Sequence, residues 1–129
     1  MALRAADPDG FAKAILDREI ARFDLADVTD DFVFYDRGFG DLASMEVQSR
    51  ELREQIAAAL RDFRYAEPVF RAPAWAAIYQ QDAERTQAWE EAVASDMATT
   101  AAWRGAGYTV VDLPLASPAD RADFILRSL

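Results

Sequence analysis

The stretch that decides the fold reads Phe32-Val33-Phe34-Tyr35-Asp36-Arg37-Gly38. Its four leading residues are apolar or aromatic without alternation, which is typical of a strand buried on both faces of a parallel sheet. The run ends at Asp36, and Gly38 favours a turn directly afterwards. Ligands of open parallel sheets bind outside the carboxyl ends of the strands, so Asp36 and Arg37 are candidate site residues.

Two interpretations of this turn remain open. In the functional one, Asp36 holds a magnesium-bound water and Arg37 grips a phosphate through its planar guanidinium. In the structural one, Asp36, Gly38, Gly40 and Asp41 only form a turn and cap a helix. The residue pattern by itself does not decide between them.

The rest of the chain predicts helices that alternate with short strands. Helical spacing of apolar residues predicts helices over about 9–25, from Asp41 or Ser44 to Phe63, over 82–104, and from Ser117 to the C-terminus, with one further helical turn around 75–79. Asp9 and Asp82 are the expected caps of two of them. Strands are expected at 32–35, 68–72 and 108–113. We therefore expect one α/β domain over residues 1–129, with three parallel strands and about five helices.

Composition narrows the possible functions. The chain has 23 Asp and Glu against 14 Lys and Arg, a formal net charge of -9, so it would repel nucleic acid over most of its surface. It contains neither Cys nor His, which excludes thiolate chemistry and the usual general base. No long apolar run or signal-like start is present, so a cytoplasmic protein without membrane contact is expected.

Three further residues are candidates for a nucleotide site. Arg71 follows the second expected strand, at the same carboxyl edge as Asp36. Tyr79 could stack on a base, although an aromatic residue at helical spacing is more often core. Arg85 lies in the first turn of the long helix and could swing over a nucleotide, whereas its structural alternative is a solvated ion pair.

The long helix itself offers no metal site. Its expected buried stripe consists of Trp89, Val93, Met97 and Ala101. Glu90, Glu91 and Asp96 are expected to form an exposed acidic patch.

The phosphate loop of a nucleotide site is missing from these 129 residues. Such a loop reads Gly-x-x-x-x-Gly-Lys-Ser/Thr, and its backbone N–H groups cradle the phosphates. The single lysine of the chain, Lys13, is followed by Ala14. The sequence thus contains only the magnesium side of a nucleotide site.

Four segments together resemble the small AAA-type P-loop ATPases related to the NadR kinase domain. They are residues 32–38 (FVFYDRG), 69–79 (VFRAPAWAAIY), 82–85 (DAER) and 107–114 (GYTVVDLP). The resemblance implies a Rossmann-like P-loop fold that uses ATP and Mg²⁺. It assigns Asp36 the Walker B role at the metal, places Arg37 beside the substrate phosphate, and makes Arg85 a lid arginine.

The chain also departs from this family pattern. The family usually shows Pro-Pro-Trp-Pro-Glu-Ile-Tyr, where this chain has Ala74, Ala76 and Ala77 in place of two prolines and the acid, and Thr86 replaces a second lid arginine. The first strand, the phosphate loop, the helix after it and the second strand of the family would precede Asp7.

These departures lead to two expectations about function. One is an ATP-dependent phosphotransferase or ATPase that is inactive as this chain, because the phosphate loop is absent. The other is a degenerate, non-catalytic interaction module. The missing first strand would lie between the strands that end near Asp36 and Arg71, so we expect a homo-oligomer or a partner chain to cover their edges.

Overall fold

The computed structural model describes residues 7–26, 32–75 and 83–129, with the backbone alone for 83–87. The chain divides into two compact units, residues 1–65 and 66–129. The described elements are five helices and one two-stranded parallel sheet. They confirm the predicted α/β class and are consistent with part of a Rossmann-like P-loop fold. No helix among the described residues is long and apolar enough to cross a membrane.

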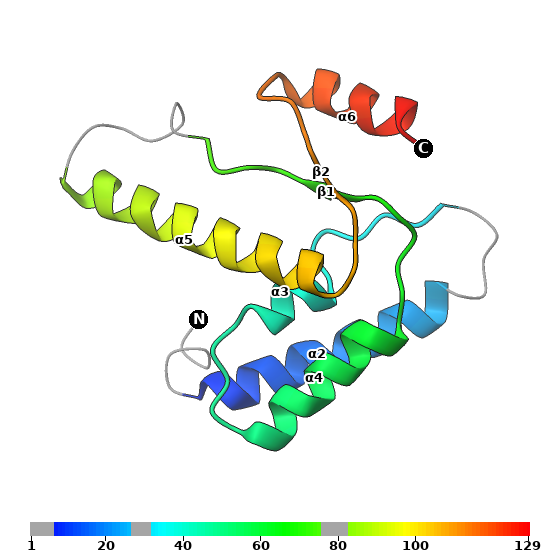
Figure 1. Cartoon of the computed structure of the whole chain (residues 1–129), viewed down its shortest axis with the longest axis vertical. Helices are drawn as coiled ribbons and strands as arrows, with labels where there is room; N and C mark the ends of the chain where they lie inside the picture. Colours follow the sequence, from blue (N-terminus) through cyan, green and yellow to red (C-terminus); the bar gives the residue numbers. More distant parts are fainter. Residues whose placement is uncertain (1–6, 27–31, 76–82) are drawn as a thin grey trace. The chain divides into compact units, whose positions relative to one another are not determined.

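The first unit is built from three helices, α2 (Pro8–Ala26), α3 (Phe39–Ala43) and α4 (Arg50–Asp62) (Figure 1). Helix α2 confirms the prediction for about residues 9–25. Its buried side includes Ala12 and Leu16, and α4 buries Leu52, Ile56, Ala59 and Leu60. The helical spacing of these residues places them on one side of each helix, which is the side that packs.

The predicted single helix from Asp41 or Ser44 to Phe63 is wrong, because the chain forms α3 and then starts again at α4. The true N-cap of α4 is Ser49, whose hydroxyl accepts a hydrogen bond from the Leu52 N–H at 3.2 Å. The Asp9 carboxylate accepts the N–H groups of Gln48 and Ser49, both at 2.8 Å. Asp9 therefore supports the start of α4, and not the start of its own helix as predicted.

An aromatic cluster forms the core of the first unit around Phe39, which is completely buried. Its ring lies 6.3 Å from that of Phe23, 5.8 Å from Phe63 and 5.7 Å from Tyr65, centroid to centroid. The Phe39 N–H also donates to the Tyr65 hydroxyl at 3.2 Å. Phe39 thus holds the start of α3 against α2 and the residues after α4.

We expect Phe39→Ala to lower the free energy of unfolding by about 3–5 kcal/mol, because it leaves a cavity that the surrounding rings cannot fill. Chemical denaturation, followed by far-ultraviolet circular dichroism, would measure the loss of stability. Phe34→Ala is the matched control, since that side chain is 61% exposed and its removal should have little effect. Equal losses for both variants would contradict the assignment of Phe39 as the core residue.

The predicted strand over residues 32–35 is wrong. The segment is not part of a sheet within the described chain. Phe32, Val33 and Phe34 are 75%, 46% and 61% exposed, whereas burial on both faces was expected. A strand forms only where a neighbouring backbone completes its hydrogen bonds. The strand β1 (Val69–Arg71) pairs with β2 (Val110–Asp112) and not with segment 32–35.

The second unit contains these two strands and the helices α5 (Ala83–Gly105) and α6 (Pro118–Arg127) (Figure 1). Both strands and both helices confirm the predictions for their segments, within a few residues. The register sets Val69 beside Val110 and Arg71 beside Asp112. The predicted cap of α6 is also confirmed, because the Ser117 hydroxyl accepts the Asp120 N–H at 3.1 Å. Asp82 and residues 76–79 lie outside the described residues.

The predicted stripe of α5 is partly wrong. Met97 is 66% exposed, and Ala101 is exposed as well. The buried side instead carries Thr100 and Trp103, both 7% exposed. Gly107, with φ of 90°, then turns the chain so that the Tyr108 ring meets Trp103 edge-on at 5.1 Å. This contact anchors the end of α5 beside the start of β2.

Candidate functional site

Asp36 and Arg37 form a bend between segment 32–35 and helix α3. Arg37 has a φ of 74°, in the left-handed region that residues other than glycine rarely adopt. Both side chains are exposed. The bend therefore presents a carboxylate and a guanidinium to solvent from adjacent positions of the chain.

The capping role in this turn belongs to Asp41. Its carboxylate accepts the Gly38 N–H at 2.9 Å, and its position in the first turn of α3 suits the positive end of the helix dipole. Within the described residues, the Asp36 carboxylate accepts no hydrogen bond and forms no ion pair. The structural interpretation of the turn is thus fulfilled without Asp36.

Asp36 can supply one oxygen ligand to a cation, but not a complete metal site. No group of three or more acidic side chains suited to a metal is present in the described part of the chain. Mg²⁺ commonly takes one or two protein carboxylates and completes its shell with water and phosphate oxygens. An exposed, unengaged carboxylate fits that use.

Arg71 lies at the carboxyl end of β1 in the second unit, where it is bound by two carboxylates. Its Nε and Nη2 donate to the two oxygens of Asp96 at 2.8 and 2.7 Å. Its Nη1 donates to Asp112 at 3.0 Å, across the strand pair. Asp96 also accepts the Ala74 N–H at 3.0 Å and the Thr100 hydroxyl at 3.3 Å. The cluster ties β1, the residues after it, α5 and β2 together.

The electrostatics of the cluster keep both partners charged. Hydrogen bonds from Arg71 hold the pKa of Asp96 below its usual value, against the opposing effect of burial. The same contact, together with Asp112, raises the pKa of Arg71. A phosphate would have to displace a carboxylate to reach this guanidinium, so the geometry favours a structural role for Arg71. Its binding of a cofactor stays a prediction.

We expect Asp96→Asn to destabilise the protein by about 1.5–3 kcal/mol, since it removes a charge-assisted bidentate contact from a half-buried arginine. Asp112→Asn is the matched control and should cost about 0–1 kcal/mol, because that side chain is 54% exposed. Urea denaturation of the three proteins at neutral pH measures the difference. A larger loss for Asp112→Asn would contradict the assignment.

The contribution of Asp96 should also depend on pH. Its pKa is lower in the folded state than in the unfolded state, so its contribution is complete above the unfolded value of about 4 and is lost as the pH falls through the folded value. The wild-type protein should therefore lose more stability between neutral pH and pH ~3 than Asp96→Asn does. Melting temperatures measured across that range would show it, and parallel curves would speak against it.

The candidate residues are distributed over both units and the undescribed segments. Asp36 and Arg37 share one bend of the first unit, and Arg71 belongs to the second. Arg85 lies in the first turn of α5, where only the backbone is described, and Tyr79 lies outside the described residues. The sequence reasoning placed Asp96 in an exposed acidic patch, but its side chain is only 16% exposed. Asp96 lies four residues before Thr100 and seven before Trp103, so helical spacing places it on the same, buried side of α5. That spacing was the sequence signal for its burial.

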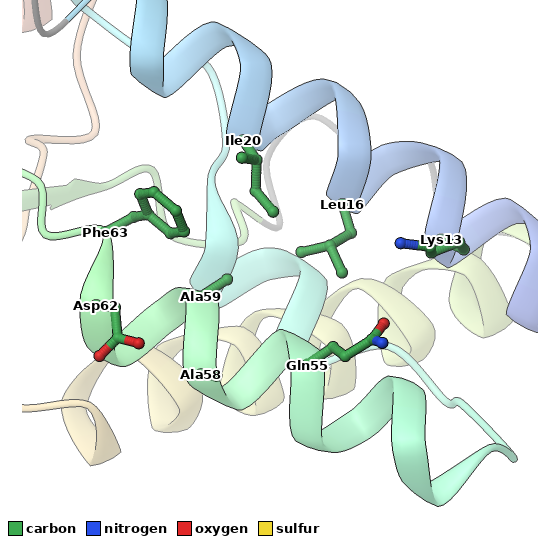
Figure 2. Close-up of a pocket in the computed structure, with 8 residues that line it drawn as sticks. All are labelled: Lys13, Leu16, Ile20, Gln55, Ala58, Ala59, Asp62 and Phe63. Atoms are coloured by element: carbon green, nitrogen blue, oxygen red, sulfur yellow. The ribbon is translucent and has the colours of Figure 1, made fainter.

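A shallow groove lies between α2 and α4 (Figure 2). It has a volume of about 250 Å³ and a mainly apolar floor that includes Leu16, Ile20 and Phe63. At its rim, the Lys13 amine binds Asp17 at 2.7 Å, and Asp62 binds Arg61 at 2.9 Å. These polar groups are already engaged, so the groove offers little for binding a charged ligand.

Residues 1–121 match a family model described as an AAA domain. No curated protein and no solved structure matches the chain.

Proposed function

The chain belongs to the AAA domain family, and on that premise we propose that Asp36 is the magnesium-side carboxylate of a nucleotide site. This family suggests a nucleotide-binding function of the P-loop NTPase type, in which ATP is bound with Mg²⁺. The proposed reaction class is ATP-dependent phosphoryl transfer, as in the NadR-like members, or ATP hydrolysis. The site needs a phosphate loop in addition to these 129 residues.

The state of the Asp36 carboxylate is the observation that supports this proposal. Asp9, Asp41 and Asp96 are each engaged by backbone N–H groups or by an arginine. Asp36 is exposed and makes no such contact among the described residues. An exposed acid without a structural contact, at the end of an apolar segment, is available to order a metal-bound water.

The neighbouring groups have complementary roles in this proposal. Arg37 extends from the same bend and would neutralise charge on a transferred phosphoryl group. Arg85 would act as a lid arginine at the start of α5. Asp36 would hold the magnesium side of the site, where a bound Mg²⁺ would supply electrostatic stabilisation of the phosphoryl group.

The residues present fit the magnesium side of such a site but not its phosphate side. These 129 residues contain no Gly-x-x-x-x-Gly-Lys-Ser/Thr, and their net charge of -9 opposes a polyanion. We therefore expect the chain by itself not to bind ATP–Mg²⁺ with micromolar affinity. Isothermal titration with and without Mg²⁺ measures this directly, and micromolar binding would require a phosphate site other than the one proposed.

The role of Asp36 is tested in a longer chain that carries a strand and a phosphate loop ahead of these residues. There, Asp36→Asn should lower ATP turnover by at least about tenfold without unfolding the protein, because metal positioning carries much of phosphoryl-transfer catalysis. Arg85→Ala should slow turnover as well, since it removes a group that stabilises transition-state charge.

The control in this experiment is Asp41→Asn. Asp41 caps α3, so its replacement should cost about 1 kcal/mol of stability and leave turnover per folded molecule unchanged. Turnover and melting temperature are measured on the same samples. Unchanged turnover for Asp36→Asn would remove the residue on which the proposal depends.

A second candidate function is a non-catalytic interaction module. The exposed apolar residues of segment 32–35 favour it, because such residues commonly mark a surface that another chain covers. This candidate requires no nucleotide.

A further inference from the structure

We infer that Tyr65 is a positioning residue for the proposed metal site, because it holds both ends of the bend that carries Asp36 and Arg37. The inference rests on the proposed function for its catalytic consequence. The geometry behind it lies within the first unit and can be tested without nucleotide.

Tyr65 contacts the residues on either side of the bend. Its ring meets that of Tyr35, which directly precedes Asp36, edge-on at 5.1 Å between centroids. The same ring lies 5.7 Å from that of Phe39, which begins α3 directly after Gly38. The Tyr65 hydroxyl accepts the Phe39 N–H at 3.2 Å. One side chain therefore holds both the entry and the exit of the bend.

Tyr65 is itself anchored to helices of the first unit. It follows the end of α4 closely and is half-buried. Its ring meets that of Phe23, from α2, edge-on at 5.6 Å. Aromatic rings prefer such edge-to-face pairs, so these contacts favour one placement of the Tyr65 ring. The Tyr35 hydroxyl also donates to the Arg22 carbonyl of α2 at 3.5 Å, which is long for a hydrogen bond. The bend is thus held against helices and not by its own residues alone.

The conformation of the bend requires such support. Arg37 has a φ of 74°, and a residue other than glycine in this region costs free energy that only the surrounding structure can offset. Asp41 binds the Gly38 N–H at 2.9 Å, so it fixes the exit of the bend. The ring contact between Tyr35 and Tyr65 fixes the entry. With both ends held, the backbone between them keeps this conformation.

A fixed bend matters for the metal because it sets the direction of the Asp36 carboxylate. Asp36 is exposed, so its direction is determined by the backbone that carries it and not by packing around its side chain. A misplacement of ~1 Å can lower a rate about 100-fold. Loss of Tyr65 should therefore slow turnover by way of Asp36, without any need for Tyr65 to touch the substrate.

Nuclear magnetic resonance of the 129-residue chain, without nucleotide, tests the geometry. A positive φ places the amide and α protons of one residue close together, so Arg37 should show a strong nuclear Overhauser effect between them. Tyr65→Leu removes the ring and the hydroxyl, and should weaken this signal to the level of residues with negative φ. Tyr65→Phe keeps the ring contacts and should keep the signal.

Phe63→Leu is the matched control. The Phe63 ring also packs on Phe23 at 5.3 Å and on Phe39 at 5.8 Å. Within the described residues it forms no ring contact with Tyr35. Phe63→Leu should therefore lower the melting temperature and leave the Arg37 signal strong.

A second variant covers the case in which Tyr65→Leu does not fold. Tyr35→Leu removes the same ring contact from the other side and should weaken the Arg37 signal as well. A signal that stays strong in either folded variant would overturn the inference. So would an equal weakening in Phe63→Leu.

The catalytic part is tested in the longer chain that carries a phosphate loop. There, Tyr65→Leu should lower turnover per folded molecule at least about fivefold, and Tyr65→Phe should restore most of it. In an Asp36→Asn background, Tyr65→Leu should have little further effect, because residues that act as a unit are not additive. An equal loss in both backgrounds would overturn the inference alone, as would undiminished turnover in Tyr65→Leu when Asp36→Asn is slow. Unchanged turnover in Asp36→Asn would overturn the proposed function as well.

Discussion

The burial of Phe39 is the constraint on which the first unit depends. Its ring meets aromatic rings from α2 and from the residues after α4, and its N–H is bound by Tyr65. Because Phe39 begins α3, this packing also fixes where the preceding bend ends. Asp36 and Arg37 are thus only two or three residues from the best-packed position of the unit, although their side chains are in water.

Several carboxylates of this acidic chain stabilise its fold through specific contacts. Asp9 and Asp41 bind the starts of helices, and Asp96 holds Arg71 at the end of the parallel strand pair. The acidic residues behind the negative net charge are therefore not all simply solvated at the surface. What distinguishes Asp36 from other exposed acids is its place at the bend directly after the apolar segment 32–35.

Local sequence patterns predicted most helices and strands of the fold. They did not predict features that depend on contacts with residues far away in the sequence. Helix α6 was readable because Ser117 and Pro118 are a local start signal, and β2 because valines follow a Gly turn. The strand predicted at 32–35 required a neighbouring backbone, which no local pattern encodes. Asp96 was misplaced because its burial depends on Arg71, 25 positions away. For the candidate site, the sequence named both Asp36 and Asp41 at this turn, and only the contacts show that Asp41 performs the capping.

The double contact of Asp9 has a consequence for how the first unit assembles. Its carboxylate reaches N–H groups that lie 39 and 40 positions further along the chain, just before α4. The first turn of α4 is therefore completed by a group from the first turn of α2. Formation of α4 should therefore be coupled to that of α2, since two N–H groups at the start of α4 lack this acceptor until α2 is in place. The amide protons of Gln48 and Ser49 would then exchange with solvent only when the helix pair separates, which makes them reporters of that opening.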